Sequence, residues 1–188
     1  LVKEQGQSLM EKAAFGVVNN RRLFHTMLRA ASTVQKPFAK DGFIRHLPMF
    51  LSDLCEFRSL PAMAEEPFRD KFLKIEQHAG IESVCKEKAA FYAGCLIDFA
   101  YPETGEAVVK VLNKAGIAVV FPEAQTCCGA PARFSGAYEV AAGNATANID
   151  ALLEEEVTYV VSACPTCTVA LKHDFAKTFT SLGMTGSI

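Results

Sequence analysis

Five of the seven cysteines in this 188-residue chain lie in its second half, and each group follows a stretch with the pattern of a β-strand. The stretches and their cysteines are Ala89–Ala93 with Cys95, Ile117–Phe121 with Cys127 and Cys128, and Val157–Val161 with Cys164 and Cys167. Helical patterns separate the stretches, and this alternation predicts a parallel sheet with right-handed crossovers. Because the carboxyl ends of parallel strands meet at one edge of a sheet, we expect the five thiols to gather there.

The expected fold class is α/β, with a small Rossmann-like βαβαβα module. Apolar residues at helical spacing predict helices over residues 102–115, 137–156 and 166–181, and Gly116 ends the first of them. We place a domain boundary near residue 85. Residues 85–188 are the expected cysteine-rich module, and residues 1–84 are a mainly helical connecting region.

The connecting region begins with a predicted helix over residues 7–36 that ends at Pro37. Further prolines then favour short helical turns and an extended stretch near residues 58–64. We expect six phenylalanines to pack this region against the rest of the chain: Phe38, Phe43, Phe50, Phe57, Phe68 and Phe72.

Composition excludes several classes of protein. A net charge of −2 provides no basic face for nucleic acid, and no apolar run approaches the roughly 18 residues of a membrane span. An odd number of cysteines without a secretory segment favours metal or redox chemistry in a reducing compartment over a disulfide scaffold. We therefore expect a cytoplasmic location. The start at Leu1 suggests a piece of a longer protein.

The spacing of the cysteines leaves several kinds of site open. A zinc site would use Cys95, one residue of the adjacent pair, Cys164 and Cys167, and would leave the other residue of the pair unused. Adjacent thiolates are easier to employ on a multi-iron cluster, because they can reach different irons. A dithiol–disulfide reductase would use Cys164 and Cys167 alone, at the start of a helix that lowers thiol pKa. Burial as ordinary small residues accounts poorly for five cysteines.

The remaining cysteines and the histidines show no comparable pattern. Cys55 lies in an apolar stretch and is expected to be buried, and Cys85 is expected to be a bystander. The four histidines share no spacing, and His173 is expected on a helix surface; the other three are His25, His46 and His78.

The cysteine motifs resemble those of a known family. They are Gly94-Cys95, the segment Gln125-Thr-Cys-Cys-Gly-Ala-Pro131, and Cys164-Pro-Thr-Cys167 with Leu171-Lys172. Together they resemble the cysteine-rich CCG module that occurs in heterodisulfide reductase, the glycolate oxidase iron–sulfur subunit, anaerobic glycerol-3-phosphate dehydrogenase and lactate-utilisation iron–sulfur proteins. The Arg58-Ser-Leu-Pro segment is similar to the region that follows ferredoxin-type clusters in lactate- and glycolate-utilisation proteins.

The resemblance implies a 4Fe-4S cluster, in a cubane or non-cubane form, that is held by Cys95, Cys127, Cys128, Cys164 and Cys167. It implies electron transfer within a lactate- or glycolate-type, or heterodisulfide-reductase-related, oxidoreductase, with flavin-containing or other iron–sulfur subunits as partners and membrane association only through them. Family members usually carry two such modules, whereas this chain contains one. The alternatives are a zinc-stabilised interaction module and the dithiol reductase.

Overall fold

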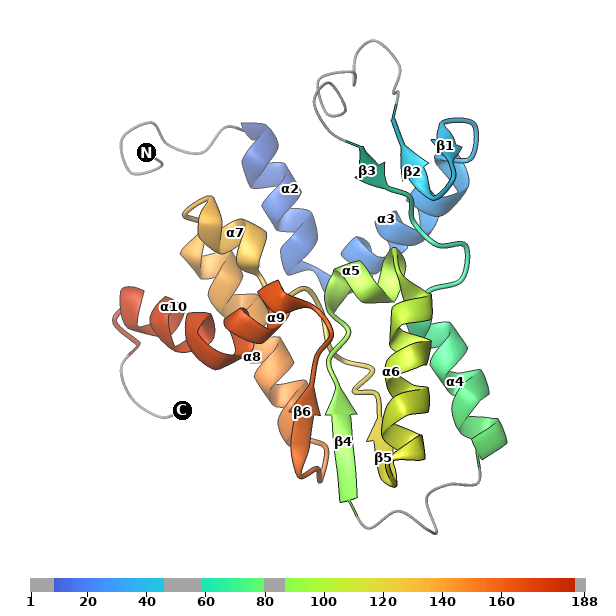
Figure 1. Ribbon diagram of the computed structural model, residues 1–188. Helices are drawn as coiled ribbons and strands as arrows, with labels where there is room; N and C mark the ends of the chain where they lie inside the picture. The colour runs from blue at the N-terminus through green and yellow to red at the C-terminus, as the bar shows by residue number, and fades with distance from the viewer. Residues whose placement is uncertain (1–8, 46–58, 80–86, 185–188) are drawn as a thin grey trace.

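The computed structural model describes residues 9–45, 59–79 and 87–184 of the chain. Within these residues, three parallel strands form the central sheet of the cysteine-rich half: β4 (Glu87–Phe91), β5 (Ile117–Val120) and β6 (Tyr159–Val161). Strand β4 lies in the middle, so that Ala90 is paired with Val120 on one side and with Val160 on the other. The predicted α/β class and the parallel sheet are confirmed (Figure 1).

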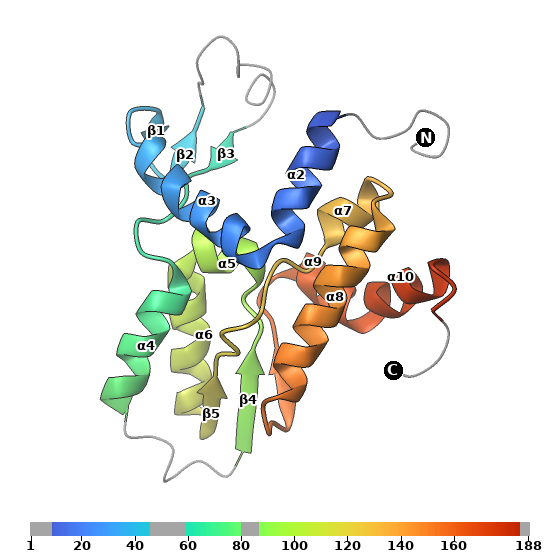
Figure 2. The same ribbon diagram turned by 180° about the vertical axis from the view of Figure 1, so that it is seen from behind.

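Helices connect these strands and cover both faces of the sheet. Helix α6 (Pro102–Lys114) connects β4 to β5, and helix α8 (Tyr138–Leu153) connects β5 to β6 on the opposite face (Figures 1 and 2). The chain therefore moves from β4 to β5 in one direction and then crosses back over β4 to reach β6. Such a reversal creates a crevice at the carboxyl ends of the strands, where doubly wound proteins bind ligands.

Short helices lie at the carboxyl edge of the sheet, next to the strand ends. They are α5 (Gly94–Phe99), α7 (Ala130–Phe134) and α9 (Pro165–Val169). The predicted final helix over 166–181 is divided, because a π-helical turn, η3 (Ala170–Asp174), separates α9 from α10 (Phe175–Ser181). None of the helices in the described residues is long and apolar enough to cross a membrane.

The first half of the chain contains helices α2 (Leu9–Asn19), α3 (Arg21–Val34) and α4 (Phe68–Ala79). The predicted single helix over 7–36 is wrong, because Asn20 adopts an extended conformation and its side chain accepts a hydrogen bond from the Leu23 backbone N–H. Asparagine favours this capping role, so a new helix begins there. Helix α2 then packs against α8 of the cysteine-rich half.

A small antiparallel sheet follows α3 and was not predicted. Its strands are β1 (Ala39–Lys40), β2 (Phe43–Ile44) and β3 (Leu60–Pro61), and β3 lies in the stretch that the prolines marked as extended. The expectation that six phenylalanines form packed anchors is confirmed for Phe68 and Phe72, which are buried. It is wrong for Phe38, in the turn before β1, and for Phe43 in β2, which are each 38% exposed. Phe50 and Phe57 lie outside the described residues.

Helix α4 joins the connecting region to the core of the cysteine-rich half. The ring of Phe68 is fully buried and meets the rings of Phe91 and Phe121 edge-on, with centroids 5.2 and 5.3 Å away. Beside it, Arg69 forms a salt bridge of 2.6 Å with Asp98, and its backbone N–H also donates to that carboxylate. Burial raises the pKa of Asp98, although the charge of Arg69 opposes the shift. The boundary near residue 85 stays a prediction, since residues 80–86 are not described.

Gly105 on α6 allows this packing, and its replacement tests it. A Cβ at Gly105 would lie 2.4 Å from the Phe68 ring, whereas a Cβ at Gly16 on α2 would meet nothing within 4 Å. We expect Gly105→Ala to destabilise the fold by about 1–3 kcal/mol through overpacking. Gly16→Ala should instead stabilise it by roughly 0.5–1 kcal/mol through helix propensity. Urea unfolding measures both, and equal stabilisation by the two substitutions would contradict the observed packing.

Candidate metal centre

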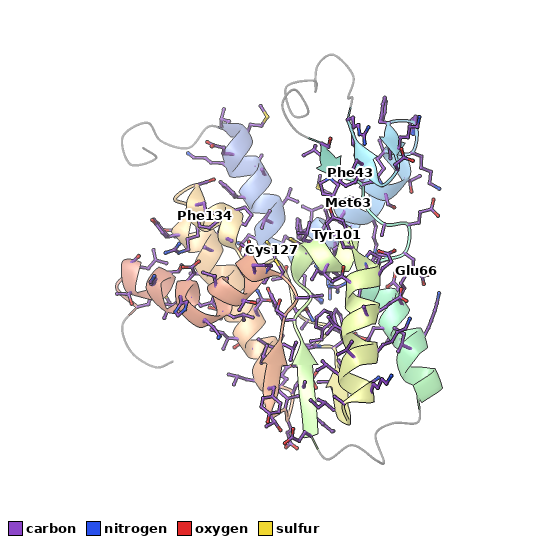
Figure 3. All side chains as sticks on the ribbon, viewed as in Figure 1. Phe43, Met63, Glu66, Tyr101, Cys127 and Phe134 are labelled. Atoms are coloured by element: carbon purple, nitrogen blue, oxygen red, sulfur yellow. The ribbon has the colours of Figure 1, made fainter. Side chains whose placement is uncertain are left out.

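The structure places the five cysteines where the strand pattern predicted, at the carboxyl edge of the parallel sheet. Cys95 lies in the first turn of α5, directly after β4. Cys127 and Cys128 lie in the loop between β5 and α7, and Cys164 is the N-cap of α9, which contains Cys167. Figure 3 shows Cys127 near the middle of the molecule, beyond the arrowheads of the strands.

The thiols form one continuous chain of contacts. The Sγ atoms of Cys95 and Cys127 are 3.8 Å apart. Cys127 interacts in turn with Cys128, Cys128 with Cys167, and Cys167 with Cys164. All five are free thiols, and four of them are buried, while Cys95 is partly exposed. Three segments that are distant in sequence thus contribute sulfur atoms to a single place.

This crowding and burial raise the thiol pKa values. The contact with Cys127, reinforced by burial, raises the pKa of Cys128 to about 12. The contact with Cys128 and burial likewise raise the pKa of Cys167, and burial raises the pKa of Cys164. Buried thiolates repel one another, so several of them can be deprotonated together only when cations lie between them. The donor set therefore fits a cationic metal centre.

Gln125 connects the end of β4 to the loop that carries the cysteine pair. Its side chain is 1% exposed; the amide oxygen accepts hydrogen bonds from the N–H groups of Ala93 and Gly94, at 2.9 and 3.4 Å. The amide nitrogen donates to the carbonyl oxygens of Phe91 and Pro122, each at 3.1 Å. One buried amide thereby holds the segment before Cys95 against the segment before Cys127.

Helix α8 and strand β4 hold the same loop from its other sides. Asn148 on α8 accepts a hydrogen bond from the Thr126 N–H at 2.8 Å and donates to the carbonyl oxygen of Cys127 at 2.9 Å. The hydroxyl of Tyr92, which directly follows β4, donates to the carbonyl oxygen of Thr126 at 2.8 Å. Burial raises the pKa of Tyr92 well above its usual value, and the neighbouring cysteines add to the shift.

Two glycines next to the cysteines have left-handed backbones. Gly94 has φ +61°, and a Cβ on it would lie 2.6 Å from the Sγ atom of Cys167. Gly129 has φ +76° and packs against the backbone of α8, where its Cβ would lie 3.1 Å from the Cα of Ala141. A side chain at Gly94 would therefore collide with a sulfur of the site.

Some buried polar groups in the part of the chain that follows β5 have no partner. Within the described residues, three buried side-chain atoms have no hydrogen-bond partner: Thr126 Oγ1, Arg133 Nε and Asn144 Nδ2. All three carry a donor hydrogen; Thr126 directly precedes the cysteine pair, Arg133 lies in α7 and Asn144 lies in α8. Buried donors cost free energy unless an acceptor meets them. Sulfide and thiolate sulfurs of a cluster would supply such acceptors, so these atoms also fit the group.

Other candidate residues do not join the site. Cys55, Cys85, His46 and the side chain of His78 lie outside the described residues. His173 is exposed on η3, as expected, and His25 packs on the ring of Phe99, where burial and neighbouring arginines lower its pKa to about 3.

The thiols are not arranged as a shell around one ion. Across 9–45, 59–79 and 87–184, no three His, Cys, Asp or Glu side chains are placed so that they could hold a single metal ion. The contacts instead connect the five thiols pair by pair, from Cys95 through to Cys164. Five thiols connected in this way outnumber the four ligands of one tetrahedral ion, whereas a group with several metal ions can employ more of them.

Sequence reasoning missed Gln125, Asn148 and Tyr92 as supports of the site. Gln125 lies two residues before the cysteine pair, but a polar residue in a loop is ordinarily exposed, and its sequence context does not reveal burial. Asn148 lies in an alanine-rich helix, on the face that is buried. Its position among the alanines of that face was the signal that could have indicated its role.

Comparison with known proteins agrees with this geometry. Residues 89–172 match the cysteine-rich domain CCG. The predicted resemblance to the CCG module is thereby confirmed over these residues. The CCG module includes all five cysteines and the residues that hold their loops.

Relatives of the chain include iron–sulfur and lactate-utilisation proteins. An uncharacterised iron–sulfur protein of Methanococcus maripaludis is 30% identical over 145 residues, which cover 77% of this chain and 28% of that protein. Another from Methanocaldococcus jannaschii is 38% identical over 92 residues, or 49% of this chain and 19% of that protein. Lactate utilization protein A 2 of Bacillus cereus is 37% identical over 92 residues, or 49% of this chain and 37% of that protein. The chain thus covers well under half the length of these relatives, and no solved structure matches it significantly.

Gly94→Ala tests whether the CCG module needs the close approach of Cys167. Gly116 is the matched control, because its φ of +79° imposes similar backbone strain while a Cβ there meets nothing within 4 Å. Both substitutions should cost about 1–2 kcal/mol through the left-handed backbone. Gly94→Ala alone should also displace Cys167 and reduce the metal content of anaerobically purified protein. Equal metal content in the two variants would show that the Gly94–Cys167 contact is unimportant.

Proposed function

We propose that this chain is an iron–sulfur electron-transfer module, in which Cys95, Cys127, Cys128, Cys164 and Cys167 hold a 4Fe-4S cluster. The observation that carries the proposal is the continuous chain of five thiols, contributed by three separate segments at the switch point of the sheet. A bound cluster supplies one-electron transfer. The protein's own residues position its ligands: Gln125 and Asn148 orient the cysteine loop, and α9 presents Cys164 and Cys167.

Use of both adjacent cysteines favours a cluster over zinc. Cys127 interacts with Cys95, and Cys128 interacts with Cys167, so each member of the pair faces a different part of the site. A tetrahedral zinc ion takes four ligands and would leave one of these thiols unused. In a cluster, Cys127 and Cys128 could each bind a different iron. Five thiolates also exceed the four that a cubane takes, which supports the non-cubane form.

The dithiol reductase finds no support at Cys164 and Cys167. A nucleophilic cysteine needs an accessible thiol with a lowered pKa. Here both side chains are buried, and burial and the neighbouring thiols raise both pKa values. Backbone hydrogen bonds at the start of α9 lower the pKa of Cys164, but burial outweighs them and the pKa remains raised.

The oxidoreductase that this module serves is proposed to be of the 2-hydroxy-acid type, with lactate or glycolate as substrate, or one related to heterodisulfide reductase. The similarity to lactate utilization protein A supports the former assignment. Electrons would come from a flavin-containing or iron–sulfur subunit or domain and leave for an acceptor. Cys95 is the partly exposed ligand, so its side of the site is the shortest route to a partner. A cytoplasmic location, with membrane association only through partners, forms part of the proposal.

Anaerobic reconstitution of the chain with iron and sulfide tests the proposal. We expect iron and acid-labile sulfide in a fixed ratio and an EPR signal on reduction. Cys128→Ser should reduce iron content strongly, because it removes a ligand that a cluster requires. Cys85→Ser is the control and should retain the iron content of the wild type, since Cys85 lies outside the cysteine pattern of the module.

Zinc would give a different result. Stoichiometric zinc without iron, and a Cys128→Ser variant that binds as much metal as the wild type, would overturn the electron-transfer proposal. That outcome would favour the zinc-stabilised interaction module.

A further inference from the structure

Two of the unpartnered buried donors belong to residues that line the cysteine loop. Thr126 is 5% exposed and Asn144 is 2% exposed, yet Thr126 Oγ1 and Asn144 Nδ2 have no hydrogen-bond partner among the described residues. Other polar groups nearby are satisfied. The backbone N–H and carbonyl groups of Thr126 are both bonded, and so are both ends of the Asn148 amide. The unsatisfied groups are therefore exceptions within a well-bonded region.

Their position follows from the way the loop runs along α8. Asn148 contacts the backbone of Thr126 and Cys127. Asn144 lies one helical turn earlier, on the same face of α8, where its Cβ would be 3.4 Å from a Cβ on Gly129. The loop from 126 to 129 thus passes across both asparagines, with the cysteine pair between them. Asn144 is thus close to Gly129, which directly follows Cys128, and Thr126 directly precedes Cys127.

We propose that the Thr126 hydroxyl and the Asn144 amide donate hydrogen bonds to sulfur atoms of the bound cluster and raise its reduction potential. This inference rests on the proposed function, because a cluster supplies the acceptors. Reduction adds negative charge to the cluster, and hydrogen bonds to its sulfurs stabilise the reduced form. Both side chains would contact the cluster directly without serving as ligands to its irons.

The redox test uses substitutions that keep the shape of each side chain. Thr126→Val and Asn144→Leu remove the donors, and Thr126→Ser keeps the hydroxyl. Thr178→Val is the matched control, since Thr178 is 2% exposed and its hydroxyl already donates to the Asp174 carbonyl oxygen one helical turn earlier. Iron and sulfide per chain are measured first in each anaerobically purified protein. EPR-monitored redox titration then gives the midpoint potential.

We expect Thr126→Val and Asn144→Leu to shift the midpoint to more negative values at wild-type iron content, and the double variant to shift it further. Thr126→Ser and Thr178→Val should match the wild type. Unchanged midpoints in Thr126→Val and Asn144→Leu, with full iron content, would overturn the inference and leave the proposed function intact. A wild-type protein that takes up no iron would overturn the proposed function and this inference with it.

If the substituted proteins lose the cluster, a second measurement tests whether donors form hydrogen bonds to the cluster of the wild-type protein. Pulsed EPR of the reduced wild-type protein in D₂O detects exchangeable deuterons close to the iron–sulfur spin. We expect couplings from donors at hydrogen-bond distance, and Thr126→Ser should retain them. Their absence from the wild type would overturn the inference.

Discussion

The buried amide of Gln125 is the interaction on which the cysteine site depends. Its four hydrogen bonds join the end of β4 to the loop after β5, so that Cys95 and Cys127 approach within 3.8 Å. Parallel pairing brings the strand ends to one edge of the sheet, but pairing alone would leave two loops free to move independently. A single side chain that bonds to both segments removes that freedom. The position of Cys127 is further held by Asn148.

The gathering of the thiols at one edge of the sheet also determines their pKa values. Buried thiols in contact have raised pKa values, so the free protein favours their protonated forms. Metal binding must displace those protons, and cluster uptake is accordingly expected to be favoured at higher pH. The site combines sulfur ligands, a glycine that makes room for Cys167 and donors that have no partner among the described residues. Without a bound group, buried donors that lack a partner cost free energy, and the crowded thiols have no cation to bind. A bound cluster would provide both the acceptors and the cations.

Much of this arrangement could be predicted from the sequence, because strand and helix alternation is a local pattern. The three strands, the helix over 102–115 and the convergence of five cysteines all follow from periodicity and the topology of parallel sheets. Features that depend on tertiary contacts could not be predicted in this way. The break at Asn20 interrupts an otherwise continuous helical pattern, and the sheet of β1–β3 has strands too short to show alternation. The burial of Gln125 and the pairing of Phe68 with Gly105 likewise depend on segments distant in sequence.

X-ray absorption at the iron and zinc edges, on anaerobically purified protein, tests the central claim most directly. The technique reports the metal, its ligands and any neighbouring metal in one experiment. A cluster on the five cysteines predicts iron in a shell of sulfur atoms with iron–iron scattering. Zinc in an isolated four-sulfur shell, with no metal–metal scattering and no iron, would contradict the assignment of this module to electron transfer.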